Sequence, residues 1–127
     1  MKWIKMALAS IIVLILWAPM VFGVELKTEP VVVELLGRFV KPEFKNDETG
    51  EKGHYYAIQL DSPIDVSADE FDGPVKDIKL MQLVFMGSSS STKDLVKKVN
   101  GKRIKVTGSL FHAHTAHHMT KVLVTVK

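Results

Sequence analysis

The chain of 127 residues contains no cysteine. Disulfides, thiolate metal sites and a cysteine-linked lipid anchor are therefore excluded. A small domain without disulfides must be stabilised by its hydrophobic core. Acidic residues are absent from Gly101 to Lys127. A carboxylate partner for any side chain in that segment must therefore come from elsewhere in the chain.

Motifs of nucleophilic catalysis are also scarce. The serine run at 88–91 contains no Gly-x-Ser-x-Gly elbow. Its one Ser-x-x-Lys match, Ser90 with Lys93, lacks the companion motifs of the enzymes that use it. The acidic segment 61–72 lacks the oxygen spacing of an EF-hand, which favours a solvated loop. The sequence therefore predicts a non-enzymatic protein.

The N-terminus has the three-part pattern of a secretory signal peptide. Lys2 and Lys5 are basic, residues 7–17 are almost wholly apolar, and Val21-Phe22-Gly23 offers a cleavage site. We expect residues 1–23 to be removed and the mature protein to be periplasmic or secreted from a bacterium. The alternative is an uncleaved anchor, because residues 4–24 are roughly long enough to span a bilayer. Membrane contact is expected only through that uncleaved segment.

Charge is unevenly distributed along the chain. Residues 24–79 contain 7 basic and 13 acidic side chains, whereas residues 80–127 contain 8 basic and 1 acidic. This asymmetry favours an anionic partner or self-association of unlike faces, and the simpler interpretation is two solvated faces. The basic residues expected to bind a ligand are Lys102, Arg103 and Lys105. Nucleic acid is disfavoured as the partner because of the export signal and the near-neutral mature charge.

Hydrophobic periodicity predicts five strands and one short helix. The strands are expected at residues 31–40, 54–60 and 78–86, from Arg103 toward His112, and at 122–126. Asp61-Ser62-Pro63 is expected to end the second strand, and the charged segment 45–53 is predicted to be a loop. The helix is expected between the serine run and Asn100-Gly101, with an apolar stripe of Leu95, Val96 and Val99.

This element order predicts an all-β domain with one short helix. A five-stranded Greek-key barrel of the OB type has its helix between the third and fourth strands, as expected here. Gly37 is predicted to mark a bend or a close backbone approach in the first strand. Residues 24–30 are a short leader, and residues 31–127 form the OB-like domain. The alternative is a small β-sandwich or an open α+β sheet.

Four of the five histidines lie within seven residues, at 112, 114, 117 and 118. His112 and His114 continue the apolar parity of the fourth strand, and His118 shares the valine parity of the fifth. The candidate metal ligands are therefore His112, His114 and His118, with His117 as a further candidate, and the imidazoles suit Zn or Cu. The alternative is a turn whose histidines hydrogen-bond the backbone and each other.

The run Leu110-Phe111-His112-Ala113-His114-Thr115-Ala116-His117-His118 resembles the signature of an uncharacterised family of secreted bacterial domains of unknown function. The resemblance extends over 32–126 through the strand pattern. The family's run often carries a third consecutive histidine, where this chain has Met119. The resemblance implies the barrel and export, and no established activity.

The sequence therefore predicts an exported module that binds an unknown small ligand or envelope component. The rival is a metal-binding protein or metal-dependent enzyme that uses the C-terminal histidines.

Overall fold

The computed structural model describes residues 24–86 and 89–127. The expected signal peptide lies outside them. The strands are β1 (Glu25–Leu26), β2 (Val32–Val40), β3 (Glu43–Lys45), β4 (Lys52–His54), β5 (Ala57–Val66), β6 (Val75–Phe85), β7 (Arg103–His112) and β8 (Val122–Val126), and the helix is α2 (Ser89–Val99). Among the described residues, no helix is long and apolar enough to cross a membrane.

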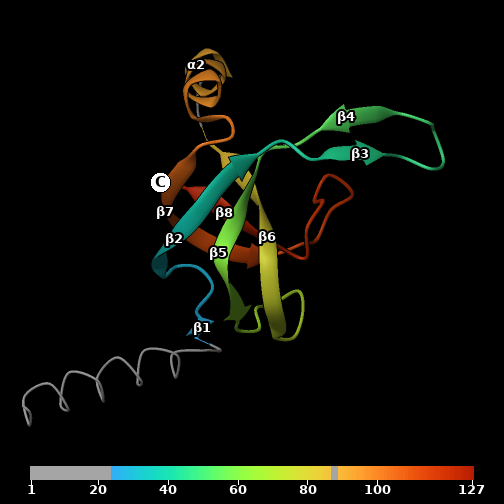
Figure 1. Cartoon of the computed structure of the whole chain (residues 1–127). Helices are drawn as coiled ribbons and strands as arrows, with labels where there is room; N and C mark the ends of the chain where they lie inside the picture. Colours follow the sequence, from blue (N-terminus) through green and yellow to red (C-terminus); the bar gives the residue numbers. More distant parts are fainter. Residues whose placement is uncertain (1–23, 87–88) are drawn as a thin grey trace, which may run out of the picture.

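Five strands close into a barrel in the order β5-β2-β7-β8-β6, and β6 returns to pair with β5 (Figure 1). Neighbouring barrel strands are antiparallel, except that β6 and β8 are parallel. Helix α2 connects the third barrel strand, β6, to the fourth, β7, and lies at one end of the barrel. The predicted OB-like barrel with one short helix is confirmed.

The barrel forms because alternate side chains of each strand point inward. On β7, Val106 and Leu110 are buried while Lys105 and Thr107 are exposed, as the alternation predicts. Apolar side chains from all five strands fill the interior, including Leu35, Phe39, Ile58, Leu60, Met81, Leu83, Val106, Leu110, Val122 and Val124. Burial of this apolar surface is the main stabilising contribution to the fold.

Two glycines permit close contact between barrel strands. A Cβ atom at Gly37 would lie 2.2 Å from the Gln59 carbonyl oxygen, and one at Gly108 would lie 2.2 Å from the Thr125 carbonyl oxygen. Such distances are far below van der Waals contact, so no larger residue fits without a backbone shift. The predicted close approach at Gly37 is confirmed.

The predicted end of the second strand at residues 61–63 is wrong. β5 continues through Pro63 to Val66. Its pairing with β6 shifts register between Gln59 and Ile64. Pro63 therefore lies where the hydrogen-bond ladder between β5 and β6 is interrupted. Its missing N–H group destabilises the sheet little at this position.

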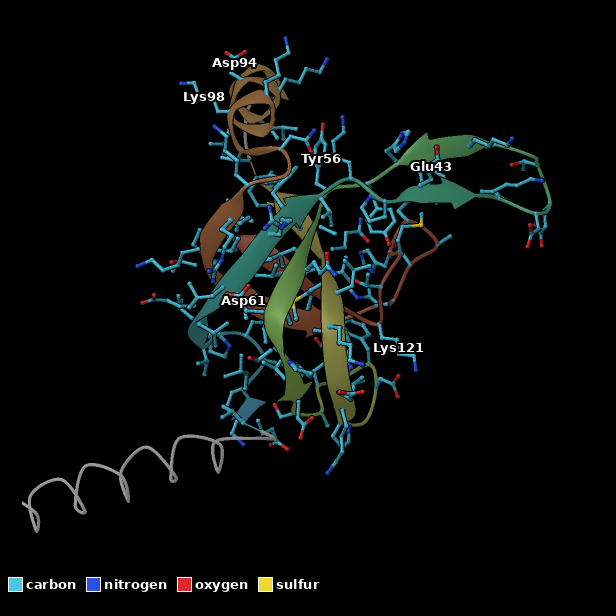
Figure 2. The ribbon with its side chains drawn as sticks, viewed as in Figure 1. Glu43, Tyr56, Asp61, Asp94, Lys98 and Lys121 are labelled. Carbon is cyan, nitrogen blue, oxygen red and sulfur yellow. The ribbon has the colours of Figure 1, made fainter. Side chains whose placement is uncertain are left out.

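Three other segments differ from the expectation. Both ends of the charged segment 45–53 belong to a β3–β4 hairpin, which extends away from the barrel in Figure 1. The leader contains β1, which pairs in parallel with β5. On α2, Val96 is buried but Leu95 is 47% exposed, so the predicted apolar stripe is only partly covered. Figure 2 shows Asp94 and Lys98 on the side of α2 that faces away from the barrel.

Candidate ligand-binding cleft

Two connections of the barrel meet around a cleft. One is the β3–β4 hairpin, between the first and second barrel strands, and the other is the loop 113–121, between the fourth and fifth. Figure 2 labels Glu43 on the hairpin and Lys121 at the end of the loop. The cleft has a volume of about 330 Å³ and is lined by Phe44, Lys45, Asn46 and Glu51 on the hairpin side and by Ala116, His117 and Met119 on the loop side.

The hairpin wall is shaped by Phe44 and by the turn that follows β3. Phe44 is opposite Gly53 in the β3–β4 pair. A Cβ atom at Gly53 would lie 2.8 Å from Phe44 Cε1, so the aromatic ring lies across the glycine. In the turn, Asn46 Oδ1 accepts the N–H groups of Glu48 and Thr49 at 2.9 and 3.3 Å. The local turn chemistry of asparagine therefore fixes this wall.

The loop wall is braced by Gln82, which lies on β6. Gln82 Oε1 accepts the Met119 N–H at 2.6 Å, and Gln82 Nε2 donates to the His117 carbonyl oxygen at 3.4 Å. The Gln82 N–H donates to Thr120 Oγ1 at 2.9 Å, and that hydroxyl donates to the Val122 carbonyl oxygen at 2.6 Å. One glutamine therefore holds the backbone of His117 and Met119, two of the three loop residues that line the cleft.

The side chain of His118 accepts hydrogen bonds from the backbone of its own loop. Its Nδ1 accepts the N–H groups of His114 and Thr115 at 3.0 and 3.3 Å. The ring packs edge-on against His114 and Phe111, with centroid distances of 4.7 and 5.4 Å. Burial, followed by the neighbouring His114 and His117, lowers the pKa of His118 from its ordinary value of 6.5. The neutral ring is therefore the form that the folded loop favours.

His112 anchors the start of the loop and is only 1% exposed. Its Nε2 lies 2.7 Å from the Ser67 carbonyl oxygen, which can only accept, so Nε2 carries the proton. The His112 N–H donates to Asp69 Oδ2 at 2.8 Å. Nδ1 of the ring is buried without a hydrogen-bond partner.

Asp69 lies in the connection between β5 and β6 and accepts the hydrogen bond from the His112 N–H at the start of the loop. Burial raises the pKa of this carboxyl group, but donated backbone N–H bonds from His112, Phe71 and Asp72 outweigh that effect and lower it. Phe71, which follows in the same turn, stacks on the His114 ring at a centroid distance of 4.0 Å. His114 Nδ1 lies 3.1 Å from the His112 carbonyl oxygen and therefore donates to it.

These contacts show which histidines the fold brings together. The rings of His114 and His118 are adjacent, whereas His112 points to Ser67 and His117 lies in the cleft wall. The unprotonated nitrogen of His112 is buried, and that of His118 accepts backbone N–H groups. Within residues 24–86 and 89–127, no three His, Asp or Glu side chains are placed to hold a metal ion.

The basic residues expected to bind a ligand lie on or beside β7. Arg103 forms an ion pair with Asp61, and Lys105 lies 3.5 Å from Glu34. Lys102 is exposed. Figure 2 shows Asp61 on the barrel wall, apart from the hairpin that carries Glu43. None of Lys102, Arg103 and Lys105 lines the cleft.

Sequence reasoning missed Phe44, Gln82 and Met119 as site residues. Gln82 carried a signal, because it is the one polar residue on its face of the otherwise apolar run Ile78-Leu80-Gln82-Val84-Met86. Phe44 had a weaker signal, since it stands alone as an aromatic residue beside a charged turn.

The fold and its loops define an OB-like β-barrel with a cleft between the first-to-second and fourth-to-fifth connections. Residues 80–127 match the protein family described as Domain of unknown function (DUF4431). That match covers β6 from Leu80 onward, α2, β7, the loop 113–121 and β8. No curated protein matches the chain.

Proposed function

We propose that this protein is an exported, non-enzymatic binding module whose ligand site is the cleft between the β3–β4 hairpin and the loop 113–121. The ligand is a small molecule or a component of the bacterial envelope. The observation that carries the proposal is the meeting of two separately braced connections around one cleft, with exposed side chains from both.

The hydrogen bonds that fix the two connections matter because binding is tighter when a site loses little conformational freedom on association. Gln82 and His118 fix the loop, and Asn46 fixes the hairpin turn, through hydrogen bonds that exist without ligand. Such preorganisation reduces the entropy cost of binding. The corresponding connections of OB barrels are their usual binding elements, and this analogy of fold supports the location only.

Export is the second part of the proposal. Its support is the basic, apolar and small-residue order of residues 1–23, together with the absence of cysteine. Cleavage after Gly23 would leave the mature barrel free of the apolar segment.

A fragment screen by two-dimensional amide NMR tests the site. A library of small polar and aromatic fragments is titrated onto the processed protein, and the shifted amides are mapped. We expect the shifts to cluster on residues 43–54 and 113–121. Met119→Arg, which fills the cleft with a charged side chain, should abolish them, and Met86→Arg is the matched control because Met86 is 76% exposed and outside the cleft. Fragments that cluster beneath α2 or on the β2–β7 wall would refute the proposal.

A further inference from the structure

The ring of Phe44 stands between two hollows of the surface. One is the cleft of about 330 Å³ shared with the loop. The other, of about 590 Å³, lies on the hairpin and is lined by Glu43, Phe44, Lys45, Lys52, Gly53 and His54. Phe44 and Lys45 line both. Two hollows that meet at one aromatic ring fit an extended ligand of repeating units better than one compact molecule.

The polar side chains around Phe44 are of mixed charge. Lys45 and Glu51 bring opposite charges to the cleft, the Asn46 amide nitrogen adds a donor, and His117 adds the two ring nitrogens of an imidazole. The second hollow repeats the mixture, with Glu43 beside Lys45, Lys52 and His54. A ligand rich in one sign of charge would meet a like charge in either hollow. A ligand rich in hydroxyl groups uses such donors and acceptors equally well.

The apolar lining of the cleft consists of Phe44, Ala116 and Met119. Phe44 supplies an aromatic face, and Ala116 and Met119 supply the opposite wall. One face of a pyranose ring presents only C–H groups, which are weakly positive and are attracted to the negative face of an aromatic ring. The rim of the same sugar carries hydroxyl groups. An aromatic platform surrounded by polar side chains of both signs therefore matches the two surfaces of a sugar.

We infer that the cleft binds a neutral oligosaccharide, with one pyranose unit on Phe44 and its neighbours in the two hollows. The inference rests on the proposed function, because it names the chemistry of the ligand at the same site. Polyanions, nucleic acid among them, are disfavoured by Glu43 and Glu51 and by the acidic residues Asp47 and Glu48 in the hairpin turn. A neutral peptide is the competing ligand that the test distinguishes.

The test titrates four neutral tetrasaccharides onto the processed protein and follows its amide NMR spectrum. The probes are β-1,4-linked tetramers of N-acetylglucosamine, glucose and xylose, and the α-1,4-linked glucose tetramer. We expect at least one to shift amides of both 43–54 and 113–121. Phe44→Ala should weaken that binding by about tenfold, the loss expected for one aromatic contact. Met119→Ala should weaken it several-fold, while Met86→Ala leaves it unchanged.

A second variant separates loss of the ring from loss of the fold. Phe44→Trp keeps an aromatic platform and should retain or tighten binding. It also introduces the sole tryptophan of residues 24–127, whose fluorescence should change as the sugar is added. Dispersed amide spectra of both variants establish that the barrel is intact.

Three results would overturn the inference. The first is the absence of any shift with all four tetrasaccharides, and the second is binding that Phe44→Ala leaves unchanged. The third is a neutral tetrapeptide pool that shifts the cleft amides while no sugar does. In that case the oligosaccharide is wrong but the proposed binding site stands. Fragments that avoid the cleft altogether would instead remove the proposed function and the oligosaccharide together.

Discussion

Replacement of His118 by alanine should destabilise the loop 113–121, because two backbone N–H groups lose the ring nitrogen that accepts their hydrogen bonds. Nδ1 accepts the N–H groups of His114 and Thr115 at 3.0 and 3.3 Å. Each such bond contributes about 0.5–1.5 kcal/mol net, so the pair amounts to about 1–3 kcal/mol. The longer bond favours the lower half of that range.

The geometry of the acceptor allows a sharper comparison than alanine alone. In His118→Asn, Oδ1 is separated from Cβ by the same number of bonds as Nδ1 of histidine, so it can accept both N–H groups. In His118→Gln, the carbonyl oxygen lies one bond further out and cannot take the same position without a different rotamer. We therefore expect Asn to retain most of the stability that Ala and Gln lose. Urea unfolding followed by circular dichroism measures the free energy of unfolding.

The same residue predicts a dependence on pH. Protonation of Nδ1 removes the lone pair that accepts both bonds, which agrees with the lowered pKa of His118 in the folded protein. The stabilising contribution is complete above the ordinary pKa of 6.5. It is lost as the pH falls below that value toward the lowered folded pKa, because the unfolded chain binds the proton first.

The difference in unfolding free energy between wild type and His118→Asn reports the titration of His118 alone, because the other four histidines are present in both proteins. That difference should favour the wild type more at pH 8 than at pH 5. A difference that does not change with pH, or an Asn variant as unstable as the Ala variant, would refute the assignment of Nδ1 as the acceptor that fixes the loop.

Four further predictions follow from separate features. Leu110→Ala, at a side chain with 0% exposure, should reduce the free energy of unfolding by about 2–5 kcal/mol, and an unchanged thermal melt would contradict its place in the core. Gly108→Ala should lower the melting temperature strongly because its Cβ would lie 2.2 Å from the Thr125 carbonyl oxygen, whereas Gly73→Ala, which meets nothing within 4 Å, should not. We expect His112→Ala to leave any Zn²⁺ binding measured by calorimetry at pH 7.5 unchanged, because Nδ1 of His112 is buried. Loss of tight Zn²⁺ binding in that variant would disprove this geometry. N-terminal sequencing of the protein from the envelope fraction should begin at Val24, and an intact Met1 in the membrane pellet would favour an anchor instead.

The barrel was predictable because its strands obey simple alternation. Val106 and Leu110 of β7 are buried on the expected parity, and Gly37 lies where a close approach requires it. The extension of β5 was not predictable from local signals. Proline usually ends a strand, and only the interruption in pairing with β6 makes Pro63 harmless.

The histidine geometry could not be predicted because alternation has meaning only within a strand. β7 ends at His112, and the following loop takes its shape from Gln82, Asp69 and His118. Two of these supports come from parts of the chain that are distant in sequence. Extending the strand parity across the loop therefore grouped three rings, whereas in the fold the His114 and His118 rings are adjacent and the His112 ring points to the Ser67 carbonyl oxygen. The β3–β4 hairpin was missed for a related reason, since it lies outside the barrel and needs no apolar pattern.

The position of β8 in the barrel has a consequence for the order of assembly. β8 fills the gap between β6 and β7, and β2 pairs with β7 across about seventy positions of the chain. A polypeptide that leaves the ribosome or crosses a membrane N-terminus first therefore cannot complete its barrel until residues 122–126 arrive. Until then β2, β5 and β6 expose their inward faces and have no closed interior. Closure therefore comes late, and the pairing of β8 with β6 and β7 is the step at which we expect the protein to become resistant to proteases.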